Sequence, residues 1–298
     1  IFTENDIDTV VHFAGLKAVG ESCEKPFLYY ENNIVGSLHL FEMMEKNDVK
    51  NIIFSSSATV YDTFRDKAPF SETNITGNTT NPYGTTKFIL ENILRDLAYH
   101  KNFNVINLRY FNPIGAHKSG LIGEDPNDIP NNLLPYVMKV AVGELEYLQV
   151  FGGDYHTKDG TGERDYIHVV DLAEAHFDAF LYLEDSESSS EGQNFVIPDS
   201  DPESINIELG DPEINSGGQM KIYEEINIGT GVSTSVFEII KITDEVIGKP
   251  LPYKVVGRRA GDVDMVYCEA EKAEKLLNWK AKLSVREAIE DQYNFVIQ

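Results

Sequence analysis

The apolar positions along the chain predict strands that alternate with helices. Residues 8–15 form a short β-branched run that ends in glycine, and a segment with apolar residues at helical spacing follows it. A second apolar run at 49–54 ends in three serines, a helical pattern starts near 83, and a third run covers 104–110. Strands that alternate with helices indicate a parallel sheet, so we predict an α/β fold with a partial doubly wound, Rossmann-type sheet.

After residue 112 the alternation weakens into loops rich in Gly, Pro and Asn. This change is typical of a smaller α/β domain that holds the substrate against the first domain. We therefore expect a partial dinucleotide-binding domain at 1–112 that returns at 129–150 and 172–228, and a substrate domain formed by 113–128, 151–171 and 229–298.

Charge and cysteine content narrow the class of protein. The 298 residues carry 25 Lys and Arg against 49 Asp and Glu, a net charge of −24, which argues against nucleic acid or a membrane surface as a partner. Two cysteines, Cys23 and Cys268, exclude a disulfide framework and favour a reducing compartment, so we expect a cytoplasmic protein. We predict no metal site. Residues 184–225 hold twelve carboxylates and one lysine, and we expect them to form an acidic surface insertion.

The sharpest chemical signal is the pair Tyr83 and Lys87, in a helix whose start Asn81 and Pro82 mark. Residues four apart share one helix face, so the ammonium is expected beside the phenol. A phenol titrates near ~10, and a nearby cation moves its pKa down, which would make Tyr83 a general base. Ser57, at the end of the preceding strand, could hold the same substrate oxygen. The same spacing also occurs by chance in many helices.

Eight segments of the chain resemble, in order, the sugar-nucleotide epimerases of the extended short-chain dehydrogenase/reductase family, and some details resemble its fungal members. The segments are 12–22, 55–61, 81–87, 108–117, 123–126, 129–133, 162–168 and 257–262. The resemblance implies an NAD-dependent isomerase of galactose metabolism that interconverts UDP-galactose and UDP-glucose by transient oxidation at sugar C4. It also implies a homodimer, and it makes Tyr83, Lys87 and Ser57 the catalytic residues.

The resemblance assigns further residues to each ligand. Those implied for the cofactor are Phe13, Ala14, Gly15, Lys17, Asn32, Ser55, Tyr83, Lys87 and Phe111. Those implied for the UDP-sugar are Ser57, Asn112, Asn132, Leu133, Phe151, Arg164, Arg259, Asp262 and Val266. The chemistry agrees, because arginine forks suit a pyrophosphate, a carboxylate suits a ribose diol, and a phenyl ring offers uracil a stacking face. The modest size of Val266 is expected to admit an N-acetyl group on the sugar.

Structural alternatives accompany these assignments. Arg164 could form a surface ion pair with its neighbour Asp165, and Phe13 and Phe111 could be core residues. Two histidines, His168 and His176, are expected to be structural, and both cysteines inert. Two other functions stay open: a sugar-nucleotide dehydratase or decarboxylase of the same family, and a catalytically silent sugar-nucleotide-binding module. The absence of a carboxylate directly after Ser57 argues against dehydration.

The resemblance also implies a segment upstream of Ile1. Dinucleotide folds of this type begin with a strand and a Gly-x-x-Gly-x-x-Gly turn, followed by an acidic residue that selects NAD. Residues 1–15 instead resemble the third helix and fourth strand of the family. We therefore expect that these 298 residues bind NAD poorly on their own.

Overall fold

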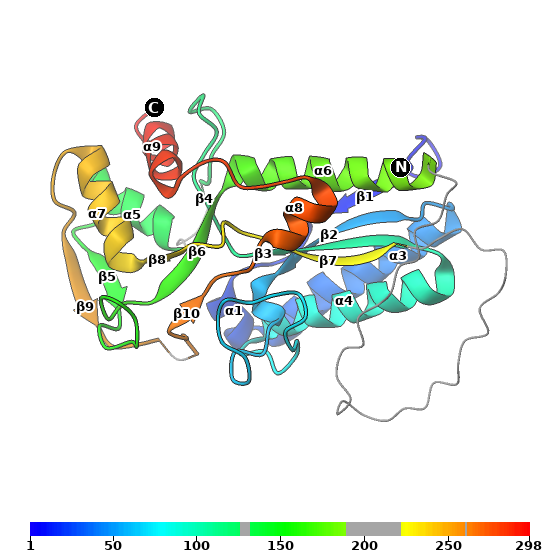
Figure 1. The fold of residues 1–298 in the computed structure, drawn as a ribbon, viewed down its shortest axis with the longest axis horizontal. Coiled ribbons are helices and arrows are strands. Elements are labelled where there is room, and N and C mark those ends of the chain that lie inside the picture. The colour runs from blue at the N-terminus through cyan, green and yellow to red at the C-terminus, as the bar shows by residue number, and fades with distance from the viewer. Residues whose placement is uncertain (126–131, 189–221, 260) are drawn as a thin grey trace.

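A parallel sheet covered on both faces forms the larger part of the computed structural model (Figure 1). The structure describes residues 1–125, 132–188, 222–259 and 261–298. The strands of this sheet lie in the order β1 (Thr9–His12), β2 (Asn51–Ser57), β3 (Asn104–Tyr110) and β7 (Tyr223–Ile228), and every pairing is parallel. The predicted α/β architecture is thereby confirmed.

Helices cover the two faces of this sheet. One face carries α3 (Gly36–Lys46) and α4 (Pro82–Lys101), and the other carries α6 (Val169–Ser188) and α8 (Glu271–Leu277) (Figure 1). The alternation of side chains along β3 divides the core accordingly: Val105 packs on the α3 and α4 side, whereas Ile106 and Leu108 pack on the side of α6. Before α3 lie α1 (Val19–Glu24), α2 (Pro26–Tyr29) and a π-helical turn at Tyr30–Val35.

The start of α4 follows from local sequence, as predicted. The side chain of Asn81 accepts a hydrogen bond from the Gly84 amide at 2.9 Å, and Pro82 occupies the first turn, where its missing N–H costs nothing. The helix ends at Lys101, and the residue that caps it, Asn102, adopts a left-handed conformation with φ of 60°. These caps fix the position of Tyr83 one residue inside the helix.

A second, smaller group of elements lies at the other end of the molecule. Its strands are β4 (Asn112–Ile114), β6 (Glu163–His168), β8 (Ser233–Ser235) and β10 (Met265–Val266), with β5 (Leu148–Phe151) paired to β9 (Tyr253–Val256). Its helices are α5 (Leu133–Ala141), α7 (Val236–Ile247) and α9 (Val285–Val296). Both α7 and α9 begin with a capping box, at Ser235 and Ser284.

Two stretches of the chain pack differently from its expected division. The range 129–150 was expected to return to the first domain, but α5 and β5 contribute Val137 and Val150 to the core that α7 and α9 complete. In the range 229–298, α8 and Trp279 pack instead against α6 and the main sheet. In each case, apolar side chains lie against the nearest apolar face, which chain order alone does not define.

The acidic segment lies largely outside the part of the chain that the structure describes. The described residues stop at the end of α6 and resume at Ile222, just before β7, so the insertion predicted at 184–225 is seen only at its two ends. No helix in the described ranges is both long and apolar enough to span a membrane.

Candidate active site

The carboxyl ends of β1, β2 and β3 meet at one edge of the main sheet. Residue pairing places Ser57, the last residue of β2, opposite Tyr110, the last residue of β3. A 3₁₀ turn at Ala58–Val60 follows β2 directly. The hydroxyl oxygen of Ser57 accepts hydrogen bonds from the backbone amide and the hydroxyl of Thr59, at 3.2 and 3.0 Å. These bonds fix the Ser57 side chain at the strand end.

Gly84 lets the first turn of α4 approach this strand end closely. A Cβ atom at position 84 would lie 2.9 Å from the carbonyl oxygen of Thr59 and 3.2 Å from its Cβ atom. Only a residue without a side chain allows that separation without moving the backbone. The glycine between Tyr83 and Lys87 therefore brings the helix that carries them against the turn after Ser57.

The Tyr83 and Lys87 side chains lie where the helix meets the strand end. The Lys87 ammonium donates to the carbonyl oxygen of Ser55 at 2.5 Å and lies 4.8 Å from the centre of the Phe54 ring and 5.8 Å from that of Tyr83. Burial raises the pKa of the Tyr83 phenol, and a hydrogen bond with Ser57 opposes that shift. The side chains that the sequence predicts to be catalytic are thus neighbours.

The direction of the Tyr83 shift differs from the expectation. The sequence predicted that the Lys87 charge would move the phenol pKa down, but in the structure desolvation dominates and moves it up. The ammonium is directed to the Ser55 carbonyl, and its own pKa falls from 10.5 to about 8 because it is buried, while the charge of Glu91 opposes that fall. Burial, which sequence spacing does not measure, decides both shifts.

The loop after β1 is fixed by Asn33, an asparagine that no local sequence pattern indicates. Asn33 accepts from the Leu16 amide at 2.8 Å, donates to the Leu16 carbonyl at 3.0 Å, and donates to the Thr86 hydroxyl at 3.2 Å. A Cβ atom on Gly15 would lie 3.3 Å from the Asn33 side-chain oxygen. The loop after β1 is thereby held against α4 at Thr86, the residue before Lys87. Sequence spacing does not reveal this role of Asn33, because its partners are distant in sequence.

The other residues assigned to the cofactor surround this loop. Phe13 is 58% exposed, with its ring centre 4.6 Å from that of His176, and Asn32 donates to Asn33 at 3.0 Å. Lys17 pairs with Glu124 at 3.1 Å, and Asn132, just before α5 and Leu133, donates to the same carboxylate at 3.4 Å. This carboxylate joins the β1 loop to the start of α5.

Phe111 is a core residue in this structure. It is buried with Tyr61, Phe70 and Cys268, and its amide donates to the Ile228 carbonyl at 3.2 Å. The next residue, Asn112, begins β4 and pairs with Tyr166 in β6. The two histidines expected to be structural are buried, His168 against Asp291 at 3.3 Å and His176 against Tyr110.

Five residues assigned to the UDP-sugar form a second group, separate in its contacts from Tyr83 and Lys87. Asp262 accepts from Arg259 at 3.0 Å and lies 3.8 Å from the Arg164 guanidinium, and the Arg259 guanidinium lies 4.9 Å from the centre of the Phe151 ring. Val266 in β10 pairs with Arg164 in β6. Two cations, one carboxylate and one aromatic ring can bind a diphosphate, a diol and a flat base.

The proposed surface ion pair between Arg164 and Asp165 does not form. Successive residues of a strand point to opposite faces, so Asp165 is buried and faces away from Arg164. Its carboxylate accepts from the amides of Thr230 and Gly231 at 2.8 and 2.9 Å. It also accepts a bond of 3.3 Å from the Cys268 thiol, whose pKa is raised by burial and by this carboxylate, as an inert thiol requires.

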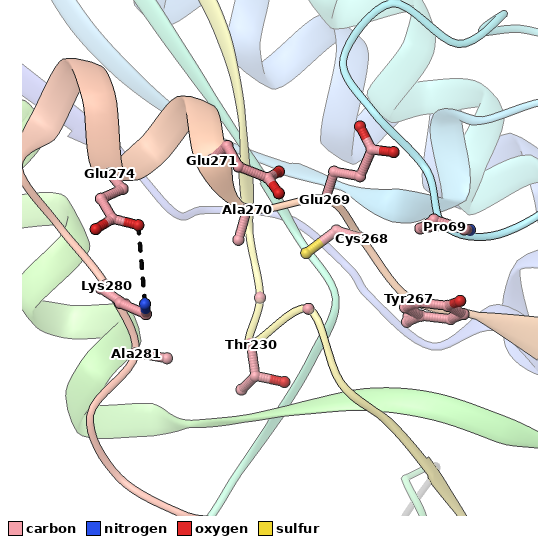
Figure 2. Close-up of a pocket in the computed structure, with 12 residues that line it drawn as sticks. Pro69, Thr230, Tyr267, Cys268, Glu269, Ala270, Glu271, Glu274, Lys280 and Ala281 are labelled. Carbon is pink, nitrogen blue, oxygen red and sulfur yellow. Dashed lines mark ion pairs between the residues drawn. The ribbon is translucent and has the colours of Figure 1, made fainter.

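A cavity of about 450 Å³ lies beside Cys268, and the residues assigned to the cofactor and the UDP-sugar do not line it (Figure 2). Glu269, Glu271 and Glu274 line it, and Lys280 pairs with Glu274 at 3.8 Å. The site proposed for the reaction is therefore the strand edge rather than this cavity.

The parallel sheet, with polar side chains at the carboxyl ends of its strands, defines an α/β protein of the dinucleotide-binding class. Residues 1–197 match the NAD dependent epimerase/dehydratase family. The chain belongs to this family.

Known relatives match nearly the whole chain. UDP-glucose 4-epimerase from Bacillus subtilis (strain 168) is 48% identical over 99% of this chain and 77% of its own length, and UDP-glucose 4-epimerase 2 from Arabidopsis thaliana is 47% identical over 99% and 75%. The crystal structure of UDP-glucose 4-epimerase from Bifidobacterium longum, in complex with NAD+ and UDP, has a TM-score of 0.83 at 46% identity and covers 99% of this chain and 78% of that one.

Proposed function

We propose that this protein is an NAD-dependent isomerase that interconverts UDP-galactose and UDP-glucose at sugar C4. The observation that carries the proposal is the convergence of Ser57, Tyr83 and Lys87 at one strand edge. The similarity to UDP-glucose 4-epimerases over nearly the whole chain supports it. We further propose that the main sheet with its helices binds the cofactor and that the smaller group of elements binds the UDP-sugar.

The residues at the strand edge suit a nicotinamide cofactor. Ser55 uses one of the three donor hydrogens of Lys87, so the ammonium can also donate to ribose hydroxyls. The Phe13 ring offers an exposed apolar face, and Gly15 adds no side chain to the loop. NAD, when bound, supplies the acceptor and then the donor for the hydride of sugar C4.

In this proposal, Tyr83 moves the proton that accompanies the hydride. As phenolate, it takes the proton of the sugar 4-hydroxyl while the C4 hydrogen leaves as hydride, and a 4-keto sugar results. The Ser57 hydroxyl donates to the 4-oxygen and orients it. After the keto sugar turns over, Tyr83 returns the proton as the hydride returns to the other face, so there is no net redox change. The Lys87 ammonium, 5.8 Å from the centre of the Tyr83 ring, would oppose through its charge the upward pKa shift that burial gives the phenol.

The UDP group is proposed to bind at the second group of residues. Arg164 and Arg259 would bind the diphosphate, Asp262 the ribose diol and Phe151 the uracil ring. Arginine forks bind phosphate oxygens through paired hydrogen bonds, which fixes the nucleotide in one orientation. Holding the nucleotide at a distance from C4 leaves the 4-keto sugar free to turn over.

The reaction is tested by incubating the full-length protein with NAD and UDP-galactose and resolving the products by anion-exchange chromatography and NMR. We expect UDP-glucose, and a loss of ~10²- to 10⁴-fold in turnover for Tyr83→Phe, since proton transfer contributes that much. A keto-deoxy sugar would identify a dehydratase. Binding of UDP without any product would identify a silent module, and either result contradicts the proposal.

We also propose that the protein acts in the cytoplasm as a homodimer. The two cysteines are both free, as expected in a reducing compartment. Along α2, the π-helical turn and the start of α3, the apolar residues Phe27, Leu28, Val35 and Leu38 are exposed, and such apolar surface favours association. Sedimentation equilibrium should give twice the chain mass, and a monomer at micromolar concentration would contradict the dimer.

A further inference from the structure

A buried carboxylate, Glu91, lies one helical turn beyond Lys87 on the same face of α4. Its two oxygens accept from Arg109 at 3.0 and 2.8 Å, which is a bidentate pair, and one of them also accepts from the Ser56 hydroxyl at 2.5 Å. Glu91 is 2% exposed and Arg109 is 1% exposed. An ion pair buried this deeply has a large desolvation cost, so its presence suggests a role beyond stability.

The pair belongs to a group of balanced charges behind the strand edge. Arg109 also contacts the Glu225 carboxylate at 2.9 Å and the Tyr61 hydroxyl at 3.3 Å. Glu91 and Glu225 thus both pair with Arg109, and the charge of Glu91 also acts on Lys87. If Glu91 lost its charge, Lys87 would lose that attraction, which disfavours a protonated Lys87.

The remaining groups around Lys87 do not provide this compensation. On β1, His12 has its pKa lowered to about 4 by burial and by the Lys87 charge, so it is neutral near pH 7. On β2, Ser55 offers only a carbonyl dipole, and on β3 burial raises the pKa of Tyr110, which is neutral as well. Tyr83, on α4, is the proposed proton acceptor, and burial raises the pKa of its phenol, so it offers Lys87 no negative charge. Glu91 is thus the carboxylate that offsets the desolvation of Lys87.

We propose that Glu91, held by Arg109 and Ser56, is a positioning residue that keeps the Lys87 ammonium protonated and the end of β2 in place for the Tyr83 proton transfer. This inference deepens the proposed function and rests on it. Glu91 touches neither the sugar nor the cofactor in this scheme; it acts through Lys87 and through Ser56, the neighbour of Ser57.

A direct test measures the protonation of Lys87 itself rather than turnover. Protein labelled with ¹³C at the lysine ε-carbon is titrated by NMR, and the Lys87 signal is assigned by its loss in Lys87→Arg. We expect Glu91→Gln to lower the Lys87 midpoint by about one pH unit or more, the size of effect that a nearby opposite charge has. Glu91→Asp keeps the charge and should stay near the original midpoint, whereas an unchanged midpoint in Glu91→Gln would overturn the proposal.

Two further variants separate charge from packing. Ser56→Ala removes a hydrogen bond without changing the charge, so the Lys87 midpoint should move less than in Glu91→Gln. The double variant Glu91→Gln/Arg109→Met removes both charges and should lower the midpoint by less than Glu91→Gln does, because the repelling guanidinium is also gone. Should Glu91→Gln fail to fold, the double variant is compared with Arg109→Met alone, and equal Lys87 midpoints in these two variants would refute the role of Glu91.

Turnover provides the second readout. In Glu91→Gln the alkaline limb of the kcat profile should move down by the same interval as the Lys87 midpoint, while KM for UDP-galactose stays within about twofold. Equal loss of kcat at every pH would indicate a merely structural role. If the unaltered protein shows no epimerisation, the proposed function fails, yet the NMR titration still decides whether Glu91 controls Lys87.

Discussion

The ammonium of Lys87 donates a hydrogen bond of 2.5 Å to the carbonyl oxygen of Ser55. This bond joins the second turn of α4 to β2 two residues before Ser57, so the helix that carries Tyr83 and the strand that carries Ser57 are fixed relative to each other. Such rigid placement is what a proton acceptor needs, because small displacements of reacting groups lower the rate strongly.

Gly84 should be intolerant of even one methyl group. In Gly84→Ala, the new Cβ would lie 2.9 Å from the Thr59 carbonyl oxygen, so α4 or the turn must shift. We expect a loss of about 1 to 3 kcal/mol in the free energy of unfolding and at least a tenfold loss of kcat. Urea denaturation and the epimerase assay measure the two effects.

Gly36→Ala is the matched control for this variant. Gly36 begins α3, and a Cβ atom there meets no heavy atom within 4 Å, so alanine should add up to about 1 kcal/mol through helix propensity. The close approach of α4 would not be the reason for glycine at position 84 if Gly84→Ala were as stable and active as Gly36→Ala.

His12 should make the protein less stable in mild acid. Its ring is buried, its Nε2 atom lies 2.7 Å from the Ser37 hydroxyl, and its pKa is lowered from 6.5 to about 4 in the folded protein. The unfolded chain therefore binds a proton between these values that the folded protein does not. The free energy of unfolding that this difference contributes is fully present above pH 6.5. It falls by about 3 kcal/mol in total as the pH drops to 4.

This dependence is measured by urea denaturation between pH 7 and pH 4. In His12→Gln, which cannot titrate in this range, the loss of unfolding free energy across the interval should shrink by that amount. His39→Gln, at an exposed position of α3, is the matched control for the substitution itself. Equal curves for the original protein and His12→Gln would rule out this assignment.

The features that the sequence predicted correctly are those encoded within a few residues. The Asn81 cap and the four-residue spacing of Tyr83 and Lys87 are local, and the structure contains both. Glu91 and Arg109 meet only because α4 packs on β3, so no local pattern indicated their pairing. The neighbourhood of Phe151 and Arg259 came from the family resemblance, since a contact across about a hundred residues has no signature in one sequence.

The two neighbouring arginines before Asp262 should differ in their effect on UDP binding. Arg259 lies between Asp262 and the Phe151 ring, whereas Arg258 contacts Asp154 and the Tyr155 ring. We expect Arg259→Met to weaken UDP binding by about 10- to 100-fold, the size of one or two charge-assisted hydrogen bonds. Arg258→Met, with the same loss of charge, should stay within about threefold. Isothermal titration with UDP compares them, and equal effects would count against a contact between Arg259 and the diphosphate.

The size of the side chain at position 266 should decide which substituents at sugar C2 the site accepts. Val266 lies in β10 beside Arg164, at the edge of the residues proposed to bind UDP, and it is only partly buried. A side chain of this size leaves room for an N-acetyl group, so we expect measurable epimerisation of UDP-N-acetylglucosamine. Val266→Tyr adds a ring to the same backbone position and should lower kcat/KM for that substrate at least tenfold, while UDP-galactose is affected less than threefold. Val266→Ala controls for the loss of the native side chain, and an N-acetyl activity that Val266→Tyr leaves unchanged would show that position 266 does not face the sugar.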